Sequence, residues 1–291
     1  FTANGCTHRK SASADFRWQS IGFVDALVDG TASGAAIIGG TLGHSTYKDD
    51  EDNLLPVVIE NCYVTGSVTS KGYVGAIGGT LSGSPVLIRN CYSAASVTGN
   101  GSSANYSGGL VGRVRTNLTM ERCYAAAPVA SPVAGGVVAG AQNSSTPAST
   151  YTNVIAWNPS VDGNTALAFG TTTELDQLSC VYTFADLLLN GEKVEEGLSH
   201  MELCEVAGTW GTPWYRTPTA GNGYPILQWQ YDRGDYRDIC GFDPESDPTS
   251  IDRLPADTDH SEWAVFNLAG QRLTKPQRGI NIVGGRKILV R

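Results

Sequence analysis

A pair of sequence blocks that recurs along the chain constrains its fold more than any other feature. A glycine-rich block ends in turn at Leu42, Leu81, Arg115 and Gln142 (GAAIIGGTL, YVGAIGGTL, SGGLVGRVR and AGGVVAGAQ). A second block follows each of these after a variable gap: IENCYVTGSVTS, IRNCYSAASVTG, MERCYAAAPVAS and YTNVIAWNPSVDG. A weaker fifth unit is expected from Ala166 (ALAFGTTT) through LSCVYTF. Repetition of this kind is typical of chains whose units stack on one another.

The spacing and composition of the units predict strands. Cys62, Cys91 and Cys123 mark the same place in successive units, 29 and 32 residues apart; Val154 takes that place in the fourth unit and Cys180 in the fifth. Units rich in Gly, Val, Ile, Ala and Thr, without apolar residues at i, i+3 and i+4, favour a coil of β-strands. We therefore predict an all-β fold, a parallel β-helix or solenoid of about five imperfect repeats with roughly three short strands per turn.

The repeated cysteines have two interpretations. At an inward-facing position they are small apolar core residues with inert thiols, and Cys62, Cys91, Cys123 and Cys180 then form a ladder. The functional alternative is a ladder that binds metal or undergoes redox chemistry. However, no histidine or carboxylate repeats beside the cysteines, and Val154 replaces the thiol in the fourth unit. Their parallel Cβ vectors are also poor disulfide geometry. We expect the core role, with no metal and no cofactor.

The runs SGGLVG and IRNCYSAASVTG resemble the GLUG repeat, a glycine-rich motif of bacterial surface proteins that also occurs beside the catalytic domains of some immunoglobulin A peptidases. The resemblance covers residues 33–182, with an acidic insertion in the first unit and loss of Cys-Tyr in the fourth. It implies a β-solenoid at the outer surface of a Bacteroidetes-type bacterium, or secreted from one, with an adhesive or ligand-presenting role.

Residues 183–242 change character. They contain a short helix, expected in FADLLLNGEKVEE, and the aromatic run WGTPWYRTPTAGNGYPILQWQY. Because the open end of a solenoid exposes strand edges and apolar core, we predict that this segment is a cap, and its GYPIL run resembles the sequence that closes GLUG arrays. The alternative is a carbohydrate platform of aromatic side chains that stack on sugar rings. Its candidate residues are Trp210, Trp214, Tyr215 and Trp229.

The remaining segments complete the expected organisation. Residues 1–32 are a lead-in or cap, and residues 243–261 are an acidic linker that contains proline. Residues 262–291 are a small β module with a hairpin turn at Gly284 and Gly285. This module resembles the C-terminal modules of secreted Bacteroidetes proteins, which implies either a sorting signal or a terminal domain. Phe1 is not a natural start, which favours a trimmed or mature chain.

Charge and hydropathy restrict the partners. The net charge is −8 with no stripe of Lys and Arg, which argues against nucleic acid and against an anionic membrane surface. No stretch of 18 apolar residues is present, so no transmembrane helix is expected. The seven cysteines are an odd number in a large chain without C-x-x-C, which disfavours a disulfide scaffold or zinc site. The expected partner is a host or surface macromolecule, either protein or glycan.

No catalytic motif is found. The four histidines are scattered, and H-E-x-x-H, G-x-S-x-G and the P-loop are absent. A polysaccharide hydrolase would need carboxylates at matching positions of neighbouring turns, but Arg89 stands between Glu60 and Glu121, where it is expected to pair with Glu60. The acidic run Asp49–Asp52 is either a solvated insertion or a calcium site, and its spacing matches no known calcium loop.

The sequence therefore favours a non-enzymatic scaffold for adhesion or ligand binding. One alternative is a non-catalytic accessory region related to immunoglobulin A peptidases, whose catalytic domain lies elsewhere in a longer chain. The other is a carbohydrate-binding or polysaccharide-processing solenoid that uses the aromatic segment after Thr209.

Overall fold

The computed structural model divides the chain into two compact units, Phe1–Trp214 and Tyr215–Arg291. The residues that it describes are 16–31, 34–44, 48–49, 51–102, 105–141, 149–170, 178–215, 224–233, 265–267, 272–273, 279–283 and 286–290. Within these ranges, no helix combines the length and apolar character needed to cross a membrane.

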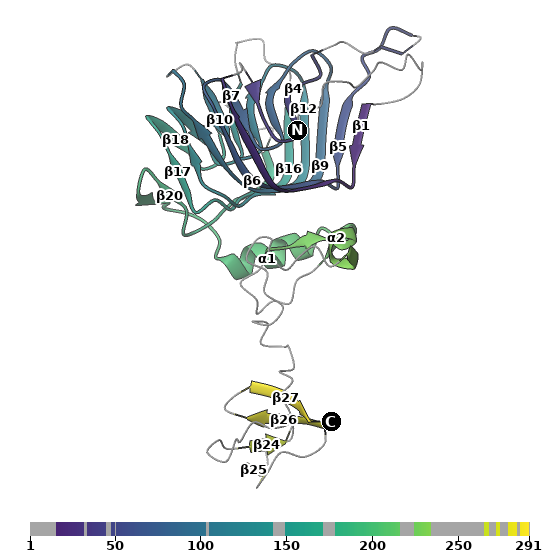
Figure 1. The fold of residues 1–291 in the computed structure, drawn as a ribbon, viewed down its shortest axis with the longest axis vertical. Coiled ribbons are helices and arrows are strands. Elements are labelled where there is room, and N and C mark those ends of the chain that lie inside the picture. The colour runs from purple at the N-terminus through teal and green to yellow at the C-terminus, as the bar shows by residue number, and fades with distance from the viewer. Residues whose placement is uncertain are drawn as a thin grey trace. The chain divides into compact units, whose positions relative to one another are not determined.

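The first unit is a coil of stacked strands in three sheets (Figure 1). The large sheet contains β1 (Phe16–Gln19), β2 (Gly22–Gly30), β5 (Val57–Glu60), β6 (Tyr63–Ser70), β9 (Val86–Gly99), β12 (Leu118–Ala125), β13 (Val129–Ala130), β16 (Thr150–Ala156), β17 (Ser160–Asp162), β19 (Leu178–Thr183), β20 (Leu188–Leu189) and β21 (Glu192–Lys193). The second contains β3 (Gly34–Ala35), β7 (Tyr73–Gly75), β10 (Tyr106–Gly108), β14 (Val133–Gly135) and β18 (Thr165–Leu167). The third contains β4 (Gly39–Leu42), β8 (Gly78–Leu81), β11 (Val111–Val114) and β15 (Val138–Ala141).

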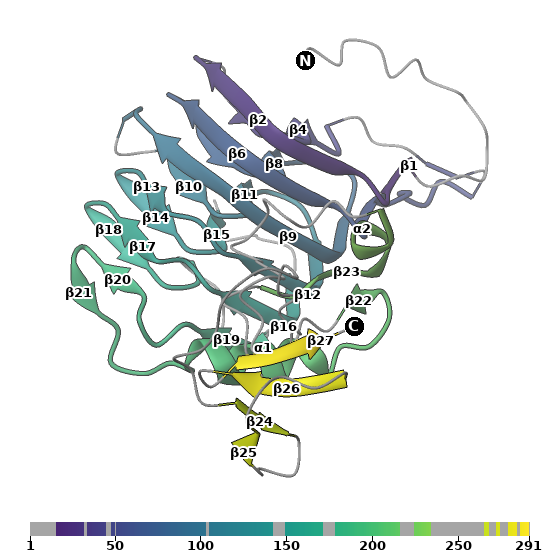
Figure 2. The same ribbon diagram turned by 60° about the horizontal axis from the view of Figure 1, so that its bottom comes forward.

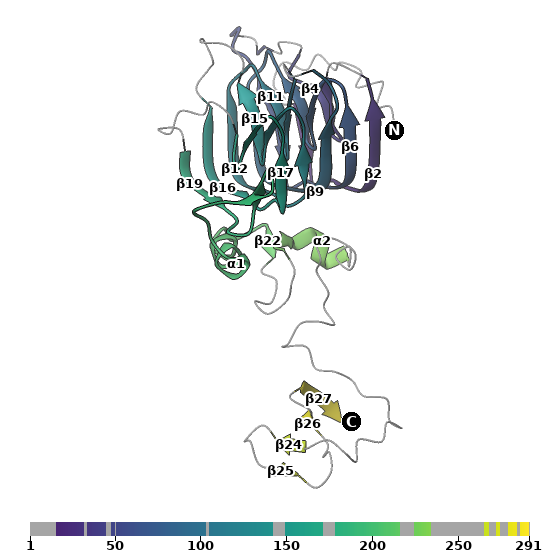
Figure 3. The ribbon, with the colours of Figure 1, turned by 90° about the vertical axis from the view of Figure 1, so that its left-hand side faces the viewer.

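All of these strands pair in parallel except β20 with β21, so the predicted solenoid-like stack of parallel sheets is confirmed. Figure 2 shows β2, β6 and β9 side by side, and Figure 3 shows this row continuing through β12 and β16 to β19. Equivalent residues of successive turns are direct partners: Val68 pairs with Val97, Val97 with Val129, and Val129 with Val161. The repeats of the sequence therefore become rows of side chains across the coil.

The sequence blocks of one turn are divided into strands differently from the prediction. The block around Asn-Cys-Tyr and its Val-rich ending form a single strand in the third turn of the coil, β9, whereas the glycine-rich block that follows is split between β10 and β11. The backbone of Gly108 explains the split, because a Cβ there would lie 2.1 Å from the carbonyl oxygen of Val111 and only glycine allows the tight corner.

The large sheet bends at one residue in each turn. In all six turns this residue has a left-handed backbone conformation: Ser20, Asn61, Asn90, Arg122, Asn153 and Cys180, with φ between 50° and 56°. Asparagine tolerates this conformation better than most residues, because its short polar side chain can hydrogen-bond locally. The Nδ2 atom of Asn90 donates to Oδ1 of Asn61 at 3.0 Å, so the bends are linked from turn to turn.

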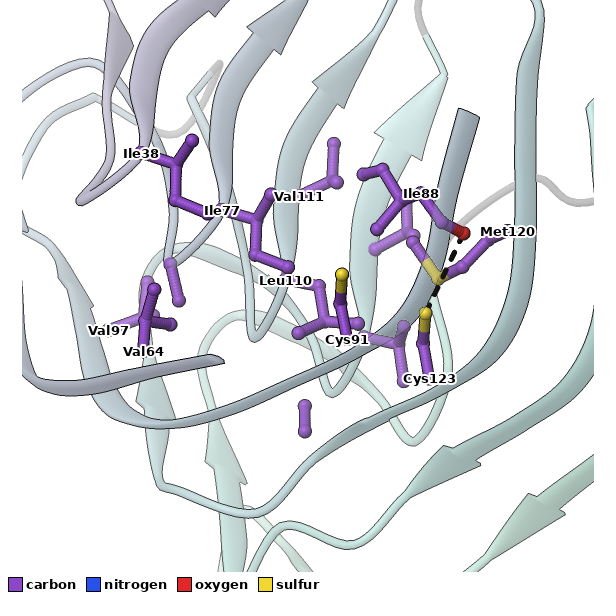
Figure 4. Close-up of a cluster of buried hydrophobic side chains, with 14 of the residues drawn as sticks. Ile38, Val64, Ile77, Ile88, Cys91, Val97, Leu110, Val111, Met120 and Cys123 are labelled. Carbon is purple, nitrogen blue, oxygen red and sulfur yellow. Dashed lines mark hydrogen bonds between the residues drawn. The ribbon is translucent and has the colours of Figure 1, made fainter. Parts of the chain in front are cut away.

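The interior of the coil is apolar and continuous. Figure 4 shows Ile77, Leu110 and Val111 pointing inward toward Cys91 and Cys123, and all five residues are fully buried. Burial of such rows across every turn is the main stabilising contribution, because each unit covers the apolar face of its neighbour.

Two expectations about the ends of the coil differ from the structure. The coil starts before residue 33, because β1 pairs with β5 and β2 pairs with β6 as a complete first turn. The helix expected in FADLLLNGEKVEE is absent. Its residues 188–193 form the β20–β21 hairpin around Asn190 and Gly191, both with positive φ, as a type I′ turn requires. The helix lies later, as α1 (His200–Gly208), which begins with a capping box between Ser199 and Glu202.

The second unit contains β23 (Ile226–Leu227), α2 (Gln228–Arg233) and an antiparallel sheet, while β22 (Trp214–Tyr215) spans the division between the units. The sheet has the order β25 (Arg272–Leu273), β24 (Val265–Asn267), β26 (Gly279–Val283) and β27 (Arg286–Val290). Val283 pairs with Arg286, so the predicted hairpin is present, although Gly284 and Gly285 themselves lie outside the described residues. The predicted linker 243–261 also lies outside them.

Candidate functional site

The cysteine ladder lies in the core of the coil. Cys62, Cys91 and Cys123 are fully buried, and Cys91 pairs directly with Cys123 on neighbouring strands. The backbone N–H of Cys62 donates to Sγ of Cys91 at 3.4 Å, and the Cys123 thiol donates to the carbonyl oxygen of Ile88 at 3.7 Å (Figure 4). Burial raises the pKa of the Cys91 thiol well above its ordinary value. A buried, protonated thiol is a poor nucleophile and a poor metal ligand, so the geometry favours packing.

Cys180 is not a member of this ladder, contrary to the prediction. Val181 pairs with Val154, which in turn pairs with Cys123. Cys180 lies one residue earlier, at the bend that Asn90 occupies in the third turn, and its side chain is exposed. The prediction aligned two cysteines by their identity, whereas the register aligns the bends.

Glu60 has a stronger structural role than the sequence suggested. Its side chain is almost fully buried and is held by Arg17 and Arg89, with Nε of Arg89 donating to Oε2 at 2.6 Å. Burial raises the pKa of Glu60, but hydrogen bonds and charge from Arg89 and Arg17 outweigh it, and the pKa lies below its ordinary value. Arg89 is also the strand partner of Glu121, so a cation stands between the two carboxylates in the register, as expected.

The tyrosines that follow the cysteines form a stack on the other side of the same strands. Tyr63 and Tyr92 lie 5.3 Å apart, and Tyr92 and Tyr124 lie 4.8 Å apart, with nearly parallel rings. Trp214 covers this stack, with its ring centroid 6.2 Å from Tyr92 and 5.7 Å from Tyr124, and Trp210 packs edge-on against Trp214 at 5.1 Å. The segment after the coil thus packs against two successive turns.

This packing removes two of the four residues of the predicted carbohydrate platform. Trp210 and Trp214 are only 6% and 8% exposed, so neither offers a face to a sugar. Tyr215 and Trp229 belong to the second unit, where Tyr215 stacks on Tyr231 at 3.8 Å and Arg233 lies over Trp229 at 5.1 Å. The structure therefore does not bring the four together as one open aromatic surface.

Helix α1 brings a thiol and an imidazole together, but not as a catalytic pair. Nε2 of His200 lies 3.6 Å from Sγ of Cys204 one turn further along the helix. Burial, followed by the charge of Glu205, raises the pKa of Cys204 to about 11, so the thiol stays protonated at neutral pH. Trp157 packs against His200, with ring centroids 5.1 Å apart, and this contact fixes the helix on the coil.

The acidic insertion is internally hydrogen-bonded. Oδ1 of Asp49 accepts from the backbone N–H groups of Glu51 and Asn53, and Lys48 pairs with Asp52 at 2.7 Å. The hydrogen bonds from Asn53 lower the pKa of Asp49. Within the described residues, no group of three His, Cys, Asp or Glu side chains is placed to hold a metal ion. Asp50 lies outside those residues.

Sequence reasoning missed a cluster on the second and third sheets of the coil, which we call the Tyr–Arg cluster: Tyr73, Tyr106, Arg113 and Arg115. The tyrosine rings stack at 6.0 Å with an interplanar angle of 11°, and the guanidinium of Arg113 lies 4.3 Å above the centre of the Tyr73 ring. All four side chains are partly or fully exposed. The signal was available, because Tyr73 and Tyr106 occupy the same place before successive glycine-rich blocks.

No protein-family model matches the sequence, and no curated protein matches it. Among solved structures, the chain is similar to a protein from Bacteroides ovatus described as a putative immunoglobulin A1 protease. The TM-score is 0.57 at 26% sequence identity, over 73% of this chain and 69% of that one. The likeness agrees with the expected link between this repeat type and immunoglobulin A peptidases, and the family itself stays a prediction.

Proposed function

We propose that this chain is a non-catalytic scaffold of GLUG-type repeats that binds a host or surface macromolecule from the outer surface of a Bacteroidetes-type bacterium, or after secretion. The observation that carries the proposal is the register of the coil. Strands of successive turns pair residue by residue, so side chains on each face stand in fixed rows. Rows of this kind form the extended, rigid surface that repeat proteins use for binding.

The most reactive side chains described on this coil have structural roles. The ladder thiols are buried, Glu60 is held by two arginines, and the Cys204 thiol is protonated. These roles support a scaffold in which the turns position a surface. The terminal module at residues 262–291 is proposed either to direct export or to form a terminal domain.

A second candidate function is favoured by the Bacteroides ovatus likeness. In this reading the coil is an accessory region of a peptidase that acts on immunoglobulin A1, and it holds the substrate while another domain cleaves it. The two functions differ in the partner that they require. A scaffold for adhesion binds surface glycoproteins broadly, whereas an accessory region binds immunoglobulin A1 in preference to other immunoglobulins.

The experiment is a comparison of immobilised partners. Purified chain is passed over mucin, immunoglobulin A1, immunoglobulin G and serum albumin by surface plasmon resonance, and each partner is examined for cleavage by gel electrophoresis. We expect binding to mucin above the albumin background and no cleavage. Selective binding to immunoglobulin A1 would favour the accessory role. Binding to none of them, or cleavage of any, contradicts the scaffold.

A further inference from the structure

We propose that the Tyr–Arg cluster is a binding site for acidic saccharides, in which Arg113 and Arg115 bind a carboxylate or sulfate group and the tyrosines contact the sugar. The proposal rests on the proposed scaffold function and names the ligand class and the surface that it uses. It is carried by the placement of two cations, for which the described residues provide no acidic partner, beside two stacked tyrosines.

The strand register explains how Arg113 reaches the Tyr73 ring. On one side its strand partner is Thr80, and on the other side it is Gly140, which has no side chain. Arg113 therefore has room to extend over the Tyr73 ring. Arg115 follows two residues later, and its backbone N–H donates to the carbonyl oxygen of Leu81 at 2.9 Å, which keeps it beside the same sheet. The charge of Arg115 acts on Arg113, so the two cations lie close together.

The charges around Arg113 are not compensated within the described part of the chain. Its electrostatic neighbours are Tyr73, Tyr106 and Arg115, with no carboxylate among them. Its Nε atom is buried, and the described residues provide neither a hydrogen-bond partner for this atom nor an ion pair for either arginine. Burial and the charge of Arg115 both lower the pKa of Arg113. In a chain of 28 acidic and 20 basic residues, uncompensated cations are places where an anion binds favourably.

The same features decide between classes of anion. Nucleic acids and anionic membranes need many cations along a surface, whereas this cluster offers two on a protein of net charge −8. A polyacidic peptide would be repelled by the same net charge. An acidic saccharide fits better, because its anionic groups are spaced along a neutral, hydroxyl-rich body and a guanidinium binds each carboxylate or sulfate in a planar fork. The phenol hydroxyls of Tyr73 and Tyr106 donate to and accept from sugar hydroxyls.

The test is isothermal titration calorimetry of the full chain with three hexasaccharides. Hyaluronan hexasaccharide carries carboxylates, keratan sulfate hexasaccharide carries sulfates, and cellohexaose is neutral. We expect at least one acidic hexasaccharide to bind tenfold or more tightly than cellohexaose, with affinity that falls as salt rises from 50 to 300 mM. The member that binds identifies the anionic group.

The variants locate the site. Arg113→Ala should weaken acidic binding at least tenfold, and Arg113→Lys should weaken it less, because the charge remains without the planar fork. Lys193→Ala is the matched control, since it removes one exposed cation that pairs with Asp186 elsewhere on the coil, and it should bind as wild type. Far-UV circular dichroism checks each fold. If Arg113→Ala unfolds, Arg113→Lys and Tyr106→Phe serve in its place.

Two results overturn the site. One is equal binding of acidic and neutral hexasaccharides or no binding of any, and the other is unchanged acidic binding by correctly folded Arg113 variants. Retention of wild-type protein on mucin separates the proposals: if it persists while either result holds, the Tyr–Arg site is wrong and the scaffold function stands. If mucin and all hexasaccharides fail to bind, both are wrong.

Discussion

At the scale of the residue, four different residue types occupy the left-handed bend of the large sheet. Asn61, Asn90 and Asn153 suit it, whereas Arg122 adopts φ 50° without the advantage of asparagine. Arg122→Asn should raise the free energy of unfolding by about 0.5–1 kcal/mol, since left-handed backbone costs about 1–2 kcal/mol for most residues. Asparagine can also donate to Asn90, as the Nε atom of Arg122 does at 2.7 Å.

Urea denaturation measures this change. Asn90→Ala is the matched control, because it places a residue without a side-chain partner at a buried bend of the neighbouring turn, and it should lower stability by about 1–3 kcal/mol. A decrease in stability for Arg122→Asn would show that the hydrogen bond of Arg122 outweighs the backbone strain.

Glu60 makes the coil sensitive to acid. Because its pKa is lowered in the folded state, the stabilisation is complete above the ordinary value of 4.5 and is lost as pH falls through the folded pKa. Glu60→Gln should reduce stability by about 1.5–3 kcal/mol at pH 7, and the difference from wild type should shrink below about pH 4.5. Thermal unfolding of both proteins from pH 7 to pH 3 checks this. A difference that is constant with pH would contradict the role of the charge.

At the scale of the element, the segment after the coil is fixed by Trp214. Its indole packs against two tyrosines of successive turns, so Trp214→Ala leaves a cavity and exposes the stack. We expect a loss of about 3–5 kcal/mol, measured by urea denaturation. The control is Met201→Ala on helix α1, which is 44% exposed and should change stability by less than about 0.5 kcal/mol. Equal effects of the two substitutions would contradict a packing role for Trp214.

The sequence predicted the stacked strands of the coil but not the elements at its two ends. The repeats predicted the stacked parallel strands, because glycine-rich corners and inward Cys and Val residues recur at matching positions. The helix in FADLLLNGEKVEE was mispredicted because its apolar run outweighed Asn190-Gly191, which is a strong hairpin signal. The first turn was missed because VDALVDG contains neither Asn-Cys-Tyr nor Gly-Gly.

The candidate site was less predictable than the fold. A single aromatic residue looks the same in sequence whether it packs or binds, and burial of Trp210 and Trp214 is decided by contacts with Tyr92 and Tyr124, far away in the chain. Arg113 belongs to no sequence motif, because the space for its side chain depends on Gly140, its strand partner in the next turn. The strand register determines such neighbours, and the spacing of the repeats predicts this register only to within one residue. Cys180 is an example, because it lies one residue before the predicted ladder position.

At the scale of the whole molecule, stacking makes local stability depend on position along the coil. Strands β9 and β12 have a neighbouring strand on both sides, whereas β2 pairs only with β6 in the described part of the chain. On β2, Leu27 is 76% exposed and Val24 is 50% exposed. Because each turn contacts only its neighbours, opening should begin at such an edge and reach the centre last.

Hydrogen–deuterium exchange followed by mass spectrometry tests this order. Peptides that cover β9 and β12 should exchange slowest, and peptides that cover β2 should exchange at least tenfold faster, because two-sided pairing protects the amides that face either neighbour. The expected gradient also bears on function, since the Tyr–Arg cluster on β7, β10 and β11 lies in the central turns, where a binding surface keeps its geometry. Uniform exchange along the coil would indicate one cooperative unit, and slower exchange of β2 would indicate that its edge is covered by a partner.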